Sequence, residues 1–338
     1  MRIGLIGLGF MGRTHLETYE RLRKEGLPVE VVAVCDADPA KLAGRGAGGN
    51  IETSSSDLDL SGYAKYTDAA EMLASERLDA VDITLPTFLH RDVTVQCLRS
   101  GVHVLCEKPM ALSVGECADM TKAAEEAGKL LMVGQCLRFW PAYVYLKEAV
   151  ANETYGKVKA AVFFRGGSTP TWAAWLTQKE KSGGALIDMH VHDADVVNWL
   201  FGKPEAVSCQ ALNVVPGSGY DIVSTHYRYP DGKVINAQAD WTLQGDFGFE
   251  MSFRVNCERG NLVFKDGVLT VNPSDASGYV PELSPELGYY FQLKYFVEAV
   301  ANGTPVSAAT PESTMETIAI IEAEVESADG GGAWTPVR

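Results

Sequence analysis

Three glycines near the start of the chain have the spacing of a dinucleotide-binding turn. Gly7, Gly9 and Gly12 follow an apolar run over residues 2–6 and open a helical pattern over residues 11–25. In such a turn the first glycine permits a tight bend, the second lets the backbone approach a diphosphate, and the third permits close packing of helix on strand. The start of the helix offers N–H groups and the positive end of its dipole to the phosphates. The pattern therefore predicts dinucleotide binding.

An aspartate follows where a carboxylate should reach the adenosine ribose. Asp36 ends the β-branched run VEVVAVCD at residues 29–36. Its carboxylate can accept hydrogen bonds from a free 2′-hydroxyl but repels a 2′-phosphate, and the next residue is Ala37 rather than an arginine that would bind such a phosphate. We therefore expect NAD as the cofactor, with NADP less favoured. The alternative, a glycine turn beside an ordinary surface aspartate, stays open at this point.

Residues 1–134 alternate strand-like and helix-like segments. This alternation is typical of βαβ units whose parallel sheet is covered on both faces, so we expect an α/β Rossmann dinucleotide-binding domain. Residues 44–56 are small and polar without periodicity and are expected to form a mobile loop. Strands are expected at residues 2–6, 29–36, 79–84, 103–107 and 129–134, and helices at 11–25, 68–75, 90–100 and 113–127.

From residue 135 the pattern changes, which predicts a second domain over residues 135–338. Alternating apolar and polar positions between residues 204 and 272, with turn signals such as PDG and KDG, indicate several strands. We expect an α+β domain for substrate binding, with a large, mostly antiparallel open sheet whose uncovered face favours a homodimer or homotetramer. A strand is also expected near residues 157–165, and helices at 141–151, 186–201, 288–302 and 311–327.

Composition restricts the partners. The chain has 338 residues and a formal net charge of −15, which argues against nucleic acid and anionic membrane surfaces. No apolar stretch is long enough to span a bilayer. The seven cysteines form no CxxC pair, so we expect reduced thiols and a cytoplasmic location. The first residues superficially resemble a signal peptide, but they run into a charged helical stretch, which makes secretion the less favoured interpretation.

Motifs downstream of the glycine turn resemble one known family. GVHVLCEKPMAL at residues 101–112 and GGALIDMHVHDAD at residues 183–195 are typical of the Gfo/Idh/MocA family, which includes glucose–fructose oxidoreductase and inositol dehydrogenase. The resemblance covers nearly the whole chain. It implies a Rossmann domain followed by an α+β domain whose open sheet often forms an oligomer interface. The other segments that fit lie at residues 85–90, 137–143 and 295–313.

The resemblance implies catalytic roles for three residues. Lys108 matches the family's catalytic lysine, and an ammonium group near a substrate hydroxyl can stabilise the developing alkoxide. Asp188 and His192 match the family's acid and histidine, and on a continuous helix their four-residue spacing places both on one face. Because imidazole titrates near neutral pH, His192 is the natural general base. Asp188 would orient the substrate or raise the basicity of the histidine.

The same resemblance implies the remaining contacts. Arg138 and Trp175 are expected to bind substrate together with the three catalytic residues. A structural salt bridge stays open for Arg138, and packing in a core stays open for Trp175 and its neighbour Trp172. The residues expected to contact the cofactor are Gly7, Gly9, Phe10, Met11, Gly12, Asp36, Thr84, Pro86, His90, Glu107, Lys108 and Arg138.

His190 departs from the family pattern, in which a small residue is common at this position. On an ideal helix it lies about 200° from Asp188 and so points away from Asp188 and His192. If the segment is a loop, His190 could join the site. Together with Asp193 these residues could also suggest a metal site, but neighbouring helical positions diverge and no further Cys/His cluster completes a coordination shell. We therefore expect no bound metal.

These observations predict an NAD-dependent oxidoreductase that oxidises a secondary alcohol of a sugar, polyol or cyclitol by hydride transfer to nicotinamide. One rival is a redox-neutral glycosidase, epimerase or lyase that uses tightly bound NAD. A second rival is a non-catalytic ligand sensor, against which the intact set of Lys108, Asp188 and His192 argues. Resemblance of fold alone does not separate net redox chemistry from a redox-neutral cycle.

Overall fold

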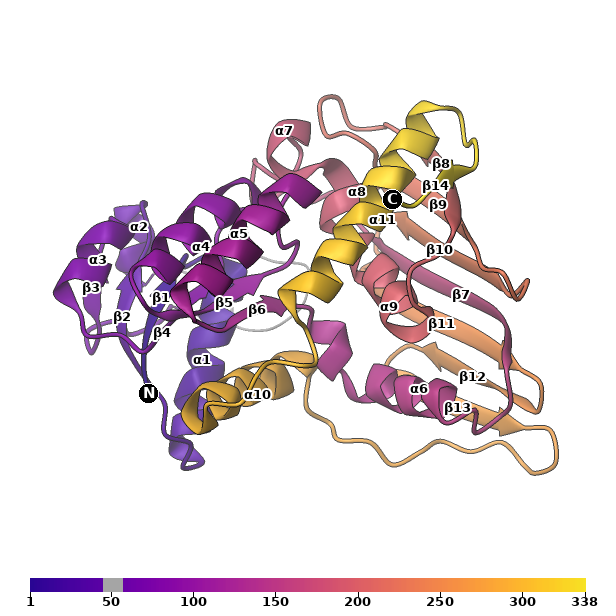
Figure 1. Cartoon of the computed structure of the whole chain (residues 1–338), viewed down its shortest axis with the longest axis horizontal. Coiled ribbons are helices and arrows are strands. Elements are labelled where there is room, and N and C mark those ends of the chain that lie inside the picture. The colour runs from indigo at the N-terminus through magenta and orange to yellow at the C-terminus, as the bar shows by residue number, and fades with distance from the viewer. Residues whose placement is uncertain (45–56) are drawn as a thin grey trace. The chain divides into compact units, whose positions relative to one another are not determined.

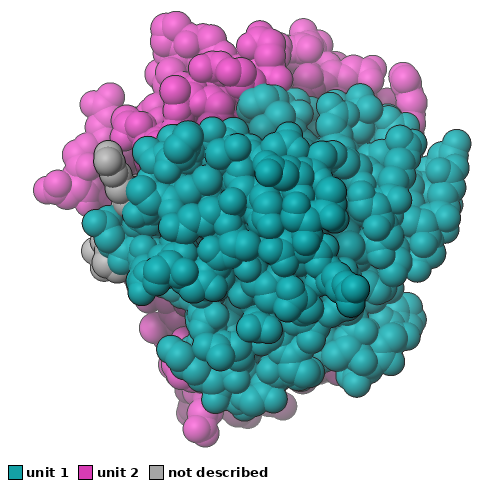
Figure 2. Space-filling model, turned by 90° about the vertical axis from the view of Figure 1, so that its left-hand side faces the viewer, with its two compact units in different colours: residues 1–136, 289–315 teal, residues 137–288, 316–338 magenta. Residues whose placement is uncertain are grey.

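The computed structural model describes residues 1–44 and 57–338. Apart from Gly44, the predicted loop at residues 44–56 lies outside the described residues. The chain forms two compact units, coloured separately in Figure 2, and it passes from one to the other three times. Unit 1 consists of Met1–Cys136 and Tyr289–Met315, and unit 2 consists of Leu137–Gly288 and Glu316–Arg338.

Unit 1 contains a six-stranded parallel sheet (Figure 1). Its strands are β1 (Arg2–Ile6), β2 (Glu30–Cys35), β3 (Ala64–Tyr66), β4 (Ala80–Ile83), β5 (His103–Glu107) and β6 (Leu131–Gly134). They lie in the order β3-β2-β1-β4-β5-β6. This is the order of a Rossmann fold, in which the winding reverses between β1 and β4 and ligands bind beside that reversal, at the carboxyl ends of the strands.

Helices connect the strands of unit 1. Right-handed crossovers place the first helix on one face of the sheet and the helices after β4 and β5 on the other. Side-chain caps begin several of them: Asp68 accepts the Glu71 N–H at the start of α3, and Ser113 accepts the Glu116 N–H at the start of α5. The helices are α1 (Phe10–Lys24), α2 (Pro39–Leu42), α3 (Ala69–Ser75), α4 (His90–Arg99) and α5 (Val114–Ala127), with a 3-10 turn η1 at Thr87–Leu89.

A late segment of the chain completes unit 1. Helix α10 (Gly288–Asn302) packs on α1, where the Tyr290 hydroxyl donates to Glu25 at 2.7 Å and the Arg21 guanidinium lies 4.6 Å from the Tyr290 ring centre. The chain then runs beside the edge strand β6, where the Val133 N–H donates to the Ala309 carbonyl at 3.2 Å. Residues 289–315 therefore contribute to the packing of the first sheet.

Unit 2 contains an eight-stranded sheet in which only β7 and β10 pair as parallel neighbours. Its strands are β7 (Val158–Gly167), β8 (Ala206–Leu212), β9 (Ile222–Arg228), β10 (Val234–Asp240), β11 (Phe249–Cys257), β12 (Gly260–Lys265), β13 (Val268–Pro273) and β14 (Thr335–Pro336). Their order is β13-β12-β11-β7-β10-β9-β8-β14. The predicted fold class, a Rossmann domain followed by an α+β domain with a mostly antiparallel sheet, is confirmed.

One face of this second sheet is covered by helices. The helices α6 (Pro141–Ala151), α9 (Val191–Phe201) and the unit 2 part of α11 (Pro311–Asp329) lie over it in Figure 1. Along β9 the side chains of Val223, Thr225 and Tyr227 are buried, whereas those of His226 and Arg228 are exposed. This alternation is typical of an antiparallel sheet with one packed and one solvated face.

The helix predicted at residues 186–201 is divided in the structure. Its parts are α8 (Gly184–Asp188) and α9, and they are separated by a turn at Met189 and His190. At this turn the His190 N–H donates to the Ala185 carbonyl, five residues back, at 2.8 Å. A bond to the fifth residue widens the helix locally and interrupts its regular ladder. The expectation of one continuous helix carrying Asp188 and His192 was therefore wrong.

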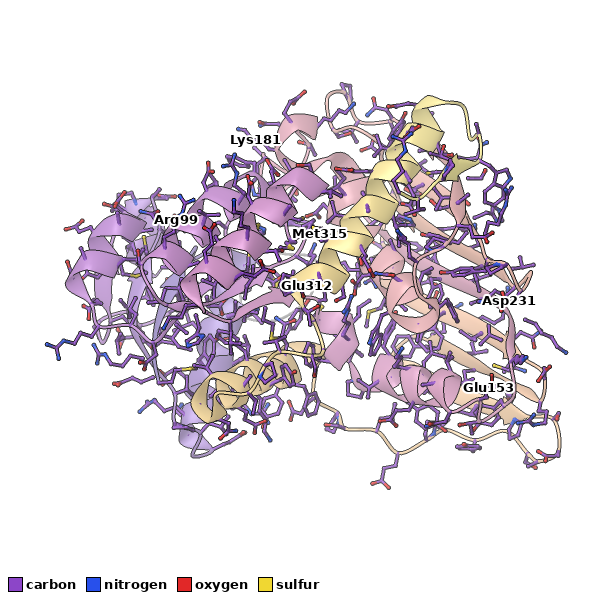
Figure 3. All side chains as sticks on the ribbon, viewed as in Figure 1. Arg99, Glu153, Lys181, Asp231, Glu312 and Met315 are labelled. Carbon is purple, nitrogen blue, oxygen red and sulfur yellow. The ribbon has the colours of Figure 1, made fainter. Side chains whose placement is uncertain are left out.

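The surface carries the negative charge of the sequence. The side chains of Glu153, Asp231 and Glu312 are exposed and extend from the ribbon (Figure 3). All seven cysteines are buried free thiols. Within residues 1–44 and 57–338, no helix combines the length and apolar character needed to cross a membrane.

Candidate active site

The glycine turn occupies the carboxyl end of β1. An added Cβ at Gly7, whose φ is +100°, would lie 2.7 Å from the Thr84 carbonyl oxygen, and one at Gly12 would collide with the Gly7 carbonyl oxygen. At Gly9 an added Cβ would meet no atom of the described residues within 4 Å. Gly7 and Gly12 are therefore required by the fold, whereas Gly9 leaves open space in front of α1. Phe10 and Met11, both half-buried, form the first turn of that helix.

Thr84 joins the glycine turn to the end of β4. Its hydroxyl donates to the Gly7 carbonyl at 2.7 Å, and its N–H donates to the Ile6 carbonyl at 2.8 Å. Thr84 was predicted to contact the cofactor. In this structure its hydroxyl group donates within the protein and joins the carboxyl ends of β1 and β4. The winding of the sheet reverses between these two strands, and a Rossmann fold binds its dinucleotide beside that reversal.

Asp36 lies beside the glycine turn and is only 5% exposed. Its carboxylate accepts the Leu8 N–H at 2.8 Å and the Asp38 N–H at 2.9 Å. The ammonium of Lys41, on the short helix α2, lies 3.2 Å from the same carboxylate. Lys41 was not among the residues predicted to contact the cofactor. A carboxylate can accept about four hydrogen bonds, so Asp36 keeps capacity for a ribose hydroxyl.

The Glu107-Lys108-Pro109 turn follows β5 at the same edge of the sheet. Glu107 is 5% exposed, and its Oε1 lies 3.4 Å from His15 Nε2 and accepts from the Gln292 amide at 3.3 Å. Its Oε2 accepts the Lys108 N–H at 3.1 Å. The Lys108–Pro109 peptide bond is cis. Glu107 was predicted to contact the cofactor, but in the structure its carboxylate faces the interior of unit 1.

A second carboxylate lies on the other side of His15. Asp82, at the centre of β4, lies 2.8 Å from His15 Nδ1, and both side chains are fully buried. Burial alone would lower the pKa of His15, but Asp82 and Glu107 outweigh burial and raise it to about 10. Burial would raise the pKa of Glu107, but His15 and Lys108 lower it below its ordinary value. His15 therefore lies between two acidic side chains that favour its protonated form.

His90 holds the far end of the same turn. Its Nδ1 lies 2.8 Å from the Pro109 carbonyl and its Nε2 lies 2.8 Å from the Leu85 carbonyl. Both contacts are hydrogen bonds only in the imidazolium form, whereas burial lowers the pKa of His90 and the two carbonyls partly offset that effect. In either form the ring joins Pro109 to the segment around half-buried Pro86. His90 was predicted to bind the cofactor, and the structure engages both its nitrogens with the protein.

Unit 2 contains the other two predicted catalytic residues. Asp188 ends α8 and His192 lies in the first turn of α9, on either side of the divided helix. Both side chains are half-buried, whereas Met189, His190 and Val191 between them are buried. The local interruption of the helix therefore leaves an acid and a histidine as the partly exposed members of this segment.

The remaining titratable residues of the segment face the interior of unit 2. His190 Nε2 lies 3.2 Å from the Glu324 carboxylate, which outweighs burial and raises the pKa of His190. Asp193 forms an ion pair with Arg165 at 2.9 Å. The sequence left open whether His190 points away from Asp188 and His192 or joins them. In the structure its side chain points into the interior of unit 2. Among the residues that the structure describes, no three His, Cys, Asp or Glu side chains are grouped so that they could hold a metal ion.

Arg138 and Trp175 differ in their surroundings. Arg138, in the 3-10 turn η2 (Cys136–Phe139), is 5% exposed and donates to Asp195 from Nε at 2.8 Å and from Nη2 at 2.7 Å. The Thr317 hydroxyl also donates to Asp195, at 2.9 Å. Arg138 therefore forms the structural salt bridge that was the alternative to substrate binding. Its guanidinium N–H groups point toward Asp195 on α9. Trp175 is half-buried before α7 (Lys179–Ser182), and its neighbour Trp172 is exposed.

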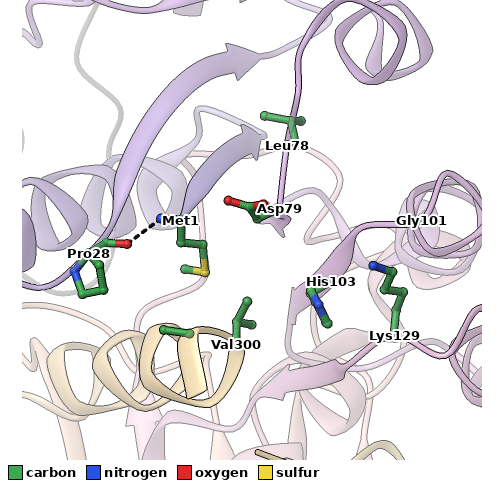
Figure 4. A pocket seen from close by; sticks show the side chains of 9 residues that line it. Met1, Pro28, Leu78, Asp79, Gly101, His103, Lys129 and Val300 are labelled. Carbon is green, nitrogen blue, oxygen red and sulfur yellow. Dashed lines mark hydrogen bonds between the residues drawn. The ribbon is translucent and has the colours of Figure 1, made fainter. Parts of the chain in front are cut away.

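A pocket of about 480 Å³ opens at the opposite, amino-terminal edge of the first sheet. Its lining includes Asp79, His103 and Lys129, and the terminal ammonium of Met1 donates to the Pro28 carbonyl at its border (Figure 4). None of the predicted site residues lines it. Dinucleotides bind at the carboxyl ends of such strands, and the glycine turn, unlike this pocket, lies at that edge.

Comparison with protein families gives two matches in consecutive parts of the chain. Residues 1–135 match a model described as "Oxidoreductase family, NAD-binding Rossmann fold". Residues 143–263 match one described as "GFO/IDH/MocA C-terminal domain". The resemblance inferred from the sequence motifs is confirmed, and residues 1–135 form an NAD-binding Rossmann domain.

The relatives have different activities. The chain is 29% identical over 246 residues to 2,7-anhydro-N-acetylneuraminate hydratase of Escherichia coli, a match that covers 70% of this chain and 60% of that protein. It is 29% identical over 270 residues to inositol 2-dehydrogenase of Rubrobacter xylanophilus, covering 77% of this chain and 70% of that protein. The matched part therefore spans less than two thirds of the hydratase.

Solved structures show the same fold. A levoglucosan dehydrogenase in complex with NADH and levoglucosan superposes with a TM-score of 0.84, covering 100% of this chain and 99% of that chain. The sequence identity is 23%, so this similarity concerns the fold. It extends over both sheets described above.

Two glycine substitutions should separate folding from cofactor binding. Gly9→Ala places a methyl group in open space, so we expect an unchanged melting temperature but at least tenfold weaker NAD binding, or about 1.4 kcal/mol. Gly12→Ala forces a methyl group against the Gly7 carbonyl and should lower the free energy of unfolding by about 1 to 3 kcal/mol. Thermal unfolding and titration with NAD measure both quantities. Equal NAD affinity in Gly9→Ala and the unmodified protein would contradict the proposed path of the diphosphate.

The pair of buried carboxylates around His15 makes stability depend on pH. Because the folded-state pKa of about 10 exceeds the ordinary value of 6.5, protonated His15 stabilises the folded state fully below about pH 6.5. This contribution is lost as pH rises through 10. We expect His15→Gln to cost about 3 to 5 kcal/mol at pH 6.5 and much less at pH 10.5. Urea unfolding at several pH values measures this, with exposed His226→Gln as control, and a cost that stays constant with pH would contradict the charge assignment.

Proposed function

Because the chain belongs to the Gfo/Idh/MocA family of oxidoreductases, we propose that it is an NAD-dependent dehydrogenase that oxidises a secondary alcohol of a sugar, polyol or cyclitol. The observation that carries this proposal is the shared sheet edge in unit 1. The glycine turn after β1 and Lys108 after β5 both lie at the carboxyl ends of the strands. That edge is where a Rossmann fold binds its dinucleotide and presents it to a substrate.

The residues present fit the cofactor. Gly9 leaves open space at the start of α1, where N–H groups and the helix dipole favour a diphosphate. Asp36 offers acceptor capacity for a ribose hydroxyl. When bound, the nicotinamide accepts the hydride that leaves the substrate carbon.

The protein's own residues handle the proton and the oxygen. In this proposal His192 accepts the hydroxyl proton as general base, and the Lys108 ammonium donates a hydrogen bond that stabilises negative charge on the substrate oxygen. Asp188 holds a neighbouring hydroxyl or the imidazole of His192. Arg138 supports the site indirectly, because its guanidinium is bound to Asp195. A hydroxyl-rich substrate suits a site built from several charged hydrogen-bonding groups.

A redox-neutral reaction is the second candidate. It is favoured by the name of the Escherichia coli relative, a hydratase, which denotes addition of water rather than net oxidation. The inositol 2-dehydrogenase and the levoglucosan dehydrogenase are named for oxidation, which favours the first candidate. Assembly as a homodimer or homotetramer through the uncovered face of the second sheet is also a proposal.

Loss of either proposed catalytic group should strongly lower turnover without weakening cofactor binding. We expect Lys108→Met and His192→Asn each to lower kcat by about 100-fold or more, because a general base and an oxyanion donor each contribute at least that much. NADH absorbance with a panel of inositols, polyols, aldoses and glycosides measures turnover, and NADH fluorescence measures binding. His226→Asn on the exposed sheet face is the matched control.

Two results would overturn this function. Unchanged turnover in both variants would reject the assigned roles. No NADH formation with any substrate, while the purified protein retains NAD, would favour the redox-neutral reaction.

Cofactor preference should depend on the Asp36–Lys41 pair. We expect the protein to prefer NAD, and Asp36→Ser to raise the ratio of kcat/KM for NADP over NAD at least tenfold. The serine removes the carboxylate that repels a 2′-phosphate, and Lys41 becomes available to bind one. Lys41→Met in the Asp36→Ser background should cancel most of that gain. An unchanged ratio in Asp36→Ser would show that other residues determine the preference.

A further inference from the structure

We propose that the buried chain Asp82–His15–Glu107 positions the proposed catalytic Lys108. This inference rests on the proposed function for the role of Lys108, but the arrangement itself lies entirely within unit 1. His15 comes from α1, Asp82 from β4 and Glu107 from the end of β5, so three separate elements meet at this point. Neither His15 nor Asp82 was among the predicted site residues.

Two hydrogen bonds and one longer ion-pair contact, that between His15 and Glu107, lead from Asp82 to the Lys108 backbone. Asp82 Oδ2 lies 2.8 Å from His15 Nδ1, and His15 Nε2 lies 3.4 Å from Glu107 Oε1. The opposite oxygen of the same carboxylate, Oε2, accepts the Lys108 N–H at 3.1 Å. Gln292 on α10 donates to Oε1 at 3.3 Å and fixes the carboxylate from another side. The orientation of Glu107 thus determines where the Lys108 backbone lies.

The turn is held at both ends while its central side chain is not buried. Glu107 and Pro109 are buried, whereas Lys108 between them is half-buried. The Pro109 carbonyl is held by His90 at 2.8 Å. A lysine has a long side chain with many rotamers. Fixing the backbone on both sides of Lys108 therefore restricts the positions that its ammonium group can reach.

The charged groups of Asp82, His15 and Glu107 are energetically costly to bury. His15 and Asp82 are fully buried, and replacing a buried ion pair by packed apolar residues is often neutral or stabilising. The Tyr289 ring on α10 also faces the imidazole, with ring centres 6.5 Å apart. Burial and the charges of Asp82 and Glu107 raise the pKa of the Tyr19 hydroxyl on α1. Because His15 is held protonated, Glu107 stays ionised and both of its oxygens remain acceptors. Packing of the core does not by itself require these buried charges. We therefore attribute them to holding the Glu107-Lys108-Pro109 turn in one conformation.

The test compares His15→Gln with a matched control on the same strand. His103→Gln alters a half-buried histidine at the opposite end of β5, where its Nδ1 accepts the Leu130 N–H. We expect His15→Gln to lower kcat by about 10- to 100-fold, since a small misplacement of a catalytic group costs up to that much, with unchanged NAD affinity. Deuterium uptake by residues 105–112 should increase in His15→Gln and stay unchanged in His103→Gln.

A double variant distinguishes positioning from general damage. If His15 acts through Lys108, His15→Gln should cause no further loss of kcat in a Lys108→Met background. The same fold loss in both backgrounds, or unchanged deuterium uptake, would overturn the inference. If His15→Gln does not fold, Gln292→Met removes the amide donor to Glu107 and tests, by the same measurements, whether the orientation of Glu107 positions Lys108. If the unmodified protein has no NAD-linked turnover, the proposed function fails, and deuterium uptake still decides whether His15 holds the turn.

Discussion

The carboxyl edge of the first sheet depends on one close approach of two backbones. The Gly7 carbonyl accepts the Thr84 hydroxyl at 2.7 Å, and a Cβ on Gly7 or Gly12 would collide with the backbone of Thr84 or of Gly7. Only residues without a Cβ allow α1 to start this close to the ends of β1 and β4. His15 lies three residues after Gly12, on the same side of α1, so the same packing brings its imidazole to Asp82.

The cost of burying charge explains the composition of the segment from residue 188 to residue 195. It contains three aspartates and two histidines, but only Asp188 and His192 remain half-buried. The other acids are each paired with an arginine from another element, Asp193 with Arg165 and Asp195 with Arg138. An unpaired carboxylate in the interior would be strongly destabilising. One short motif therefore provides both site residues and interior ion pairs.

Patterns among residues close in sequence were sufficient to predict most of the fold and the outline of the candidate site. Strand and helix periodicity predicted the parallel sheet, and the glycine spacing predicted the turn, because both depend on neighbours in sequence. The interruption at His190 was not predicted, and its side chain contacts Glu324, more than a hundred residues later, which no local pattern marks. His15 and Lys41 were missed for a similar reason. Their partners are carboxylates on other elements, and no local signal marks an ion pair between distant residues.

The return of residues 289–315 to unit 1 has a consequence for synthesis of the protein. The six strands of the first sheet leave the ribosome early, but α10, which supplies Gln292 and Tyr289, is translated roughly 150 residues later. At cellular rates of elongation this delay is roughly eight to thirty seconds. During that time the nascent sheet exposes the surface of α1 that α10 later covers. A chaperone that binds this surface of the nascent chain would have this interval in which to act.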